Sequence, residues 1–168
     1  MEQNRLNKIK RSVAGGLVGA FLFLLAACNS GSSSSEQWKA NNDDAYNQIK
    51  KNSNWALIST PEGPTGVYCQ VLVAGKGDEH PIQTASVTVN YTGKYYTGTV
   101  FDSGTSVTFN VNGVVIGLGV ALQNMVVGDK WNVCIPYYLG YGASIYSSIQ
   151  AYTTLFFEVE LLKINQYP

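Results

Sequence analysis

Apolar and polar residues alternate most clearly in the stretch 87–109, which predicts a group of β-strands. Residues 87–92 place Val and Tyr side chains on one side and Thr and Asn on the other, the period of a half-buried strand. Gly93 interrupts this pattern, and residues 95–101 follow closely enough to form a hairpin partner that ends in a Phe-Asp-Ser-Gly turn. The alternation resumes at 107–111, so we expect three strand segments here.

These segments bring aromatic side chains towards one concave face. Tyr91, Phe101 and Phe109 can converge there, with a single carboxylate, that of Asp102, beside them. An apolar aromatic cup with one acid is typical of a site for a small uncharged group. The alternative is that these rings are core aromatics, as Phe157 would also be, and that Asp102 caps a turn.

Four other stretches complete the predicted domain. Residues 66–74 alternate as a first strand, and apolar residues at helical spacing over 120–126 predict a helix that ends before a glycine. Residues 130–135 form a further strand, and residues 154–164 alternate almost perfectly as the last one. Several β-segments with one helix predict an α+β domain in which a twisted sheet wraps around that helix.

Residues 36–51 have apolar side chains at near-helical spacing and two lysines in the last turn, which predicts a short amphipathic helix. Its apolar side, which carries Trp38, Tyr46 and Ile49, is a candidate docking face, for instance in a homodimer. The alternative is a helix that packs on its own domain or is partly frayed. Residues 52–65 are predicted to be connecting chain, so that residues 36–65 form an extension before the domain.

The first 28 residues follow a different pattern. Four basic residues precede the uncharged apolar segment 13–27, and small residues close it, as in a secretory signal peptide over 1–27. The segment is shorter than the roughly 20 residues of a membrane-spanning helix, which disfavours a transmembrane anchor.

The sequence Leu-Ala-Ala-Cys at 25–28 resembles a bacterial lipobox. This resemblance implies that Cys28 becomes the first mature residue and carries lipid, which anchors the protein to the membrane. The alternative is an ordinary cleaved signal. Residues 28–35 are rich in serine and are predicted to be a flexible linker. For a protein that resembles bacterial lipoproteins, the absence of an acidic run after Cys28 implies the periplasmic side of the outer membrane, while exposure on the cell surface stays open.

Short motifs appear in a fixed order along the chain: YTG at 91–93, FDS at 101–103, TF at 108–109, VVIGL at 114–118, GYG at 140–142 and TLFFEVELLKI at 154–164. Together they resemble the FKBP-type peptidyl-prolyl isomerases, the macrolide-binding immunophilins, over about residues 66–164. The resemblance implies an FKBP-like curved antiparallel sheet on one short helix, in a domain spanning 66–168. It also implies an isomerase that acts on X-Pro bonds of exported chains, is inhibited by macrolides and needs no cofactor or metal.

The resemblance implies a pocket with two kinds of residue. Its catalytic positions are Tyr91, Phe101, Asp102, Phe109, Tyr141 and Phe157, and its substrate-binding positions are Val114, Val115, Leu118 and Ile149. Tyr141 and the backbone N–H near Val115 are expected to donate hydrogen bonds to substrate carbonyl groups, and Asp102 is expected to orient the site. Tyr141 lies between two glycines in a loop, where an aromatic residue has little structural purpose.

The chain departs from the family pattern at the base of the pocket. Leu118 stands where the family usually has tryptophan, so a large flat surface and an indole N–H are missing. Ile116 stands where bacterial relatives often have proline, and Gln150 and Ala151 replace another common proline. These departures leave open a second function, that of a non-catalytic peptide-binding or chaperone-like envelope lipoprotein with the same fold.

Charge and cysteines narrow the remaining possibilities. The 168 residues carry 11 basic and 11 acidic side chains, and four of the basic ones lie in the signal segment, which argues against nucleic-acid binding. His80 is the sole histidine, so a histidine-based metal site or catalytic triad has no second member.

Cys69 and Cys134 lie on strands that neighbour each other in the family, so they form either a disulfide or two buried free thiols.

Overall fold

The computed structural model describes residues 33–166. The predicted signal peptide, Cys28 and the linker up to residue 32 lie outside the described residues. Neither helix of the described part is both long enough and apolar enough to cross a membrane.

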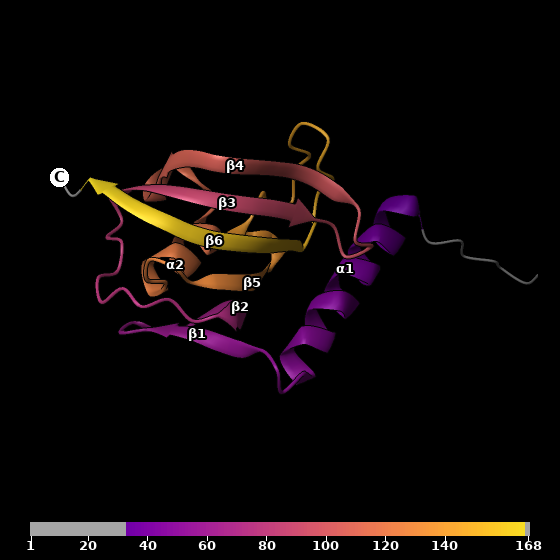
Figure 1. Cartoon of the computed structure of the whole chain (residues 1–168). Coiled ribbons are helices and arrows are strands. Elements are labelled where there is room, and N and C mark those ends of the chain that lie inside the picture. The colour runs from indigo at the N-terminus through magenta and orange to yellow at the C-terminus, as the bar shows by residue number, and fades with distance from the viewer. Residues whose placement is uncertain (1–32, 167–168) are drawn as a thin grey trace, which may run out of the picture. The chain divides into compact units, whose positions relative to one another are not determined.

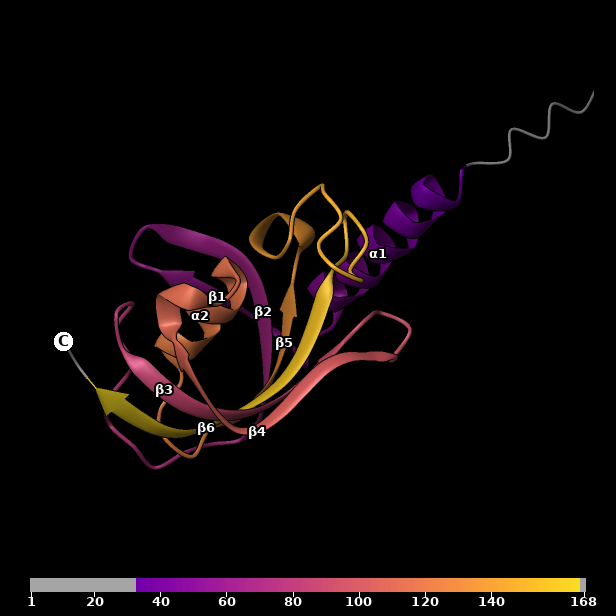
Figure 2. The same cartoon turned by 90° about the horizontal axis from the view of Figure 1, so that it is seen from above.

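Six antiparallel strands form one curved sheet in the order β1-β2-β5-β6-β3-β4 (Figure 1). The strands are β1 (Ala56–Thr60), β2 (Gly63–Val73), β3 (Ser86–Lys94), β4 (Val100–Asn110), β5 (Lys130–Ile135) and β6 (Leu155–Gln166). Seen from above, the sheet curls around α2 (Ile116–Asn124), which lies against its concave face (Figure 2). The predicted α+β architecture with a sheet wrapped on one short helix is confirmed.

The core lies between this concave face and α2. Alternate residues of β3 and β6, such as Val87, Val89, Val159 and Leu161, are at most 1% exposed, and Leu122 of α2 is fully buried against the same cluster. Burying each of these side chains contributes about 1.5–3 kcal/mol relative to exposure. The alternation predicted for the last strand is therefore the feature that holds the sheet on the helix.

The prediction of separate strands at 95–101 and 107–111 is wrong. Residues 95–99 form the turn, closed by a hydrogen bond from the Tyr95 N–H to the Thr99 carbonyl at 2.9 Å, and β4 then runs without a break. Gly93 does not interrupt β3 either. A Cβ atom there would lie 2.6 Å from the Phe101 ring and 2.9 Å from the Phe157 ring, so glycine allows two aromatic rings to pack on the backbone.

The predicted connector and linker are more ordered than their composition indicated. Part of the connector is β1, an edge strand of the sheet, so the domain begins before residue 66. The helix α1 (Ser34–Lys51) takes in the end of the serine-rich linker, because Ser33 and Glu36 form a capping box. The same serines that indicated flexibility thus start a helix.

The apolar side of α1 packs on its own domain, as one of the two alternatives predicted. The Trp38 indole N–H donates to Thr153 Oγ1 at 3.1 Å, and the Tyr46 hydroxyl donates to the Gly66 carbonyl at 2.7 Å. Between them Asn42 is fully buried, and its side-chain oxygen accepts the Thr154 N–H at 2.9 Å. The side proposed for docking is therefore occupied within the described chain.

Cys69 and Cys134 are free thiols, so the disulfide alternative is wrong. The strands β2 and β5 are neighbours, but Cys69 lies opposite Val133 and Cys134 opposite Tyr68. Because side chains alternate between the faces of a sheet, this offset of one residue directs the two thiols to opposite faces.

Candidate functional site

A cavity of about 380 Å³ opens where β3, β4 and β6 meet the start of α2. It is lined by Tyr91, Asp102, Phe109, Gly113, Val114, Val115, Leu118, Tyr141, Tyr146 and Phe157. The structure thus brings together eight of the ten residues predicted for the site. Gly113 and Tyr146 were missed, and Phe101 and Ile149 do not line the cavity but belong to or pack against the core cluster.

Aromatic rings from three adjacent strands form the wall. Tyr91 of β3 packs against Phe109 of β4 with ring centres 5.4 Å apart, and against Phe157 of β6 at 6.4 Å. Phe101 meets the edge of Phe157 at 5.7 Å and the ring of Tyr95 at 5.1 Å. Phe101 therefore packs against a ring of the wall, although it is not among the residues that line the cavity.

Ile149 anchors the loop that closes one side of the site. Its side chain is 6% exposed within the core cluster, and its backbone exchanges two hydrogen bonds with Tyr146, at 3.0 and 2.9 Å. Ser147, between them, has a φ of 52°, in the left-handed region. This tight turn holds Tyr146 over the cavity while Ile149 points into the core.

The base of the cavity is the first turn of α2. Leu118 is 5% exposed there, and the carbonyl of Val115 accepts the N–H groups of Leu118 and Gly119 at 2.9 and 3.1 Å. No hydrogen bond from the N–H of Val115 to another group is present within residues 33–166. This N–H is therefore available to a ligand carbonyl.

Asp102 and Tyr91 form the polar pair of the site. The Tyr91 hydroxyl donates to Asp102 Oδ2 at 2.8 Å, and the other carboxylate oxygen accepts the N–H of Ser103 at 2.9 Å. Burial and this hydrogen bond raise the pKa of Tyr91 to about 12. Asp102 thus bonds both to the backbone beside it, within β4 and not in a turn, and to a ring of the wall.

Tyr141 stands opposite this pair on the loop after the 3₁₀ turn Tyr137–Leu139. Burial and the neighbouring Tyr146 and Asp102 raise its pKa, so its hydroxyl stays a proton donor at neutral pH. Tyr146 stacks on it with ring centres 4.6 Å apart and planes 13° apart. This contact could not be predicted, because Tyr146 lies in a loop without periodicity.

Metal ions have no cluster of suitable side chains in the described part of the chain. Within residues 33–166 no three His, Cys, Asp or Glu side chains are close enough to hold a metal ion. His80 is exposed, and its ring nitrogen Nδ1 lies 3.1 Å from the Met125 carbonyl oxygen. The cavity itself offers apolar rings, the hydroxyl groups of three tyrosines and a backbone N–H, a combination that suits an uncharged ring flanked by carbonyl groups.

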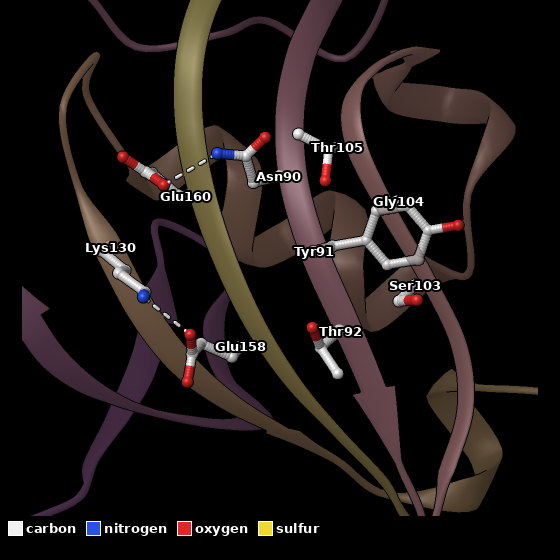
Figure 3. A pocket seen from close by; sticks show the side chains of 9 residues that line it. All are labelled: Asn90, Tyr91, Thr92, Ser103, Gly104, Thr105, Lys130, Glu158 and Glu160. Carbon is white, nitrogen blue, oxygen red and sulfur yellow. Dashed lines mark hydrogen bonds and ion pairs between the residues drawn. The ribbon is translucent and has the colours of Figure 1, made fainter.

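The outer face of the sheet, turned away from α2, has a second hollow of about 580 Å³ (Figure 3). It is lined by Asn90, Tyr91, Thr92, Ser103, Gly104, Thr105, Lys130, Glu158 and Glu160. Its charged groups are paired, with Lys130 Nζ 2.7 Å from Glu158 Oε1 and Asn90 Nδ2 donating to Glu160 Oε2 at 3.0 Å. Tyr91 lines both hollows.

The comparisons with known proteins agree with one another. A family model described as FKBP-type peptidyl-prolyl cis-trans isomerase matches residues 77–162. The FKBP-type 22 kDa peptidyl-prolyl cis-trans isomerase of Escherichia coli is 38% identical over 134 residues, 77% of this chain and 64% of that protein. Outer membrane protein MIP of Legionella longbeachae is 38% identical over 108 residues, 61% of this chain and 46% of that protein. The chain thus spans less than two thirds of either relative.

Among solved structures, a peptidyl-prolyl cis-trans isomerase from Pseudomonas syringae superposes with a TM-score of 0.71 at 29% sequence identity. The match covers 80% of this chain and 98% of that one. The similarity therefore extends beyond the residues that the family model matches.

Proposed function

Because the chain belongs to the family of FKBP-type peptidyl-prolyl cis-trans isomerases, we propose that it catalyses isomerisation of X-Pro bonds in polypeptide chains. The observation that carries this proposal is the aromatic cavity of about 380 Å³ with the Tyr91–Asp102 pair at its edge. Its apolar lining suits a proline ring, and its hydrogen-bond donors suit the carbonyl groups on either side.

The reaction needs no nucleophile, because only rotation about the amide bond is required. Amide resonance sets a barrier of about 18–20 kcal/mol, and the uncatalysed reaction takes tens of seconds or longer. The planar amide is more polar than the twisted one, so an apolar enclosure disfavours the ground state relative to the transition state. Lowering the barrier by about 4 kcal/mol gives roughly a thousandfold acceleration.

Each part of the cavity has a role in this mechanism. The rings of Tyr91, Phe109 and Phe157 enclose the proline, while Phe101 packs against the Phe157 ring and Ile149 belongs to the core cluster. The Tyr141 hydroxyl and the Val115 N–H donate hydrogen bonds to substrate carbonyl groups and so hold the chain while the bond rotates. The Asp102 carboxylate keeps the Tyr91 hydroxyl, and with it the ring, in place.

We further propose that the enzyme acts in the bacterial cell envelope on exported chains. The signal-like segment 1–27 and the lipobox-like sequence ending at Cys28 support this location, and lipid on Cys28 would anchor the protein to the outer membrane. One relative is named an outer membrane protein, which agrees with this proposal.

Leu118 favours a second candidate function, peptide binding without efficient catalysis. The side chain lies at the base of the cavity, where the family usually has a tryptophan. Leucine offers less surface to a proline ring and no N–H donor. A substrate would then be bound by the walls but held less firmly at the rotating bond.

The deciding experiment measures cis-to-trans isomerisation of a short X-Pro peptide by the parent protein and the variants Tyr141→Phe and Leu118→Trp. If the protein is an isomerase, we expect turnover by the parent, lower activity in Tyr141→Phe, and equal or higher activity in Leu118→Trp. Absence of turnover in the parent, with activity gained in Leu118→Trp, would establish the binding function instead. A macrolide should compete for the same cavity.

A further inference from the structure

A β-bulge in β4 lies directly beside the ring of Tyr91. On β3, Val89 pairs with Val107 and Tyr91 pairs with Gly104, so a single residue, Asn90, faces two residues of β4. The two are Thr105 and Ser106, and Ser106 has a φ of 55°, which L-residues rarely adopt. The bulge is therefore a constrained conformation that needs support.

Asn90 supplies this support from the outer face of the sheet. Its side-chain oxygen accepts the backbone N–H of Ser106 at 2.9 Å, and its side-chain nitrogen donates to Glu160 Oε2 at 3.0 Å. Glu160 lies directly opposite Asn90 on β6 (Figure 3). The carboxylate thus fixes the orientation of the amide, and the amide fixes the unpaired residue of the bulge.

The bulge determines which residue of β4 lies under the Tyr91 ring. Without the additional residue, Thr105 rather than Gly104 would stand opposite Tyr91, since a shift of one residue exchanges the faces of a strand. A Cβ atom on Gly104 would lie 2.8 Å from Tyr91 Cε1. The ring therefore fits only against glycine, and in this position its hydroxyl reaches Asp102.

We propose that Asn90, oriented by Glu160, is a positioning residue that holds Tyr91 and Asp102 in the geometry the isomerase site needs. The inference rests on the proposed function. Asn90 does not line the cavity, so it acts through the bulge and Tyr91 and not through the substrate. It connects the polar outer face of the sheet to the aromatic cavity on the opposite face.

The test combines a variant that should lose activity with a second substitution that should restore the activity only if Asn90 acts through the bulge. Asn90→Ala removes the hydrogen bond to Ser106 N–H, and we expect kcat/KM to fall by about tenfold through displacement of the ring. Adding Ser106→Gly should restore most of the activity, because glycine adopts a positive φ without steric cost. Thr88→Ala, on the same strand and face but bonded to Thr108 and Asn165, is the matched control and should keep parental activity.

A readout independent of activity is the ¹³Cζ NMR resonance of Tyr91, assigned with Tyr91→Phe. It should move in Asn90→Ala and return in the double variant with Ser106→Gly. An unmoved resonance, unchanged kcat/KM in Asn90→Ala, or a double variant as impaired as the single one would each overturn the proposal. If the parent shows no isomerase activity while the resonance moves and returns, the proposed function fails and the structural link stands.

Discussion

At the scale of the residue, Tyr91 belongs both to the aromatic wall of the site and to its polar pair. Its ring contacts Phe109 and Phe157 on the two flanking strands, and its hydroxyl bonds to Asp102. Loss of the hydroxyl would keep the apolar ring but remove the hydrogen bond through which Asp102 holds it. Effects on substrate binding and on the polar pair can therefore be separated by single substitutions.

The raised pKa of Tyr91 predicts how stability depends on pH. Tyrosine in an unfolded chain titrates near 10, whereas burial and the bond to Asp102 raise the pKa of Tyr91 to about 12. The folded state holds this proton more tightly, so its contribution to stability is complete below about pH 10 and is lost as the pH rises towards 12. Tyr91→Phe lacks this group, and we expect its free energy of unfolding to fall less steeply over this range.

Urea unfolding of both proteins at pH 8, 10 and 11 measures this difference. Tyr141, whose pKa is also raised, is present in both proteins, so its contribution cancels in the comparison. Parallel curves for the parent and Tyr91→Phe would show that the hydroxyl has the same pKa in both states.

The limits of prediction from sequence are also clearest for single residues. Tyr91 and Phe109 could be placed because strand alternation directs them to one face, and Asp102 could be placed because its motif resembles that of the family. Tyr146 could not, because its place depends on a turn with a positive φ at Ser147 in a loop without periodicity. Such positions are set by backbone hydrogen bonds and not by side-chain pattern.

At the scale of the element, the predictions from sequence failed where the pairing register between strands, and not the β-propensity of a segment, determines the structure. The segments 95–101 and 107–111 were separated by a predicted turn, yet residues 100–110, which include that turn, form one strand, β4. Residues 102–104 of the predicted turn pair with β3, and the register shifts after them, at a bulge of residues 105 and 106 that Asn90 of β3 supports. A contact between strands of this kind has no signature within the segment itself.

The helix α1 is a second element whose role depends on tertiary contacts. Its sequence predicts an amphipathic helix, but not that Asn42 is the residue it buries completely. The amide bonds to the Thr154 N–H and, within the helix, to the Trp38 carbonyl, both at 2.9 Å. A buried polar residue thus docks this helix together with the aromatic residues that the pattern indicated.

Asn42→Ala should therefore destabilise the protein. It leaves the N–H of buried Thr154 without its acceptor, and an unsatisfied buried group costs about 1–3 kcal/mol. Asn47→Ala, at an exposed position on the same helix, is the matched control and should change the free energy of unfolding by less than about 0.5 kcal/mol. Equal midpoints in urea for the two variants would contradict this account.

At the scale of the whole molecule, α1 connects to the cavity although it does not line it. Trp38 packs against Tyr95 and Tyr96 in the turn between β3 and β4, with ring centres 5.7 and 5.4 Å away. Tyr95 in turn packs on Phe101 and donates to the Ser148 carbonyl at 3.3 Å, in the loop that carries Tyr146. The helix thus supports the two segments that flank the site.

This arrangement predicts that the extension is part of the catalytic domain. We compare a chain that begins at residue 33 with one that begins at residue 53, which lacks α1 but keeps all six strands. The shorter chain loses the hydrogen bonds of Trp38, Asn42 and Tyr46 to the domain, so its free energy of unfolding should be lower by about 3 kcal/mol.

Activity should fall as well, because the turn at 95–99 and the loop carrying Tyr146 lose their common support. We expect a higher KM with a smaller change in kcat, since substrate enclosure is weakened while Tyr141 and the base of the cavity remain. Full stability and parental KM in the shorter chain would show instead that α1 is an independent appendage. The comparison therefore decides whether residues 34–51 belong to the enzyme itself.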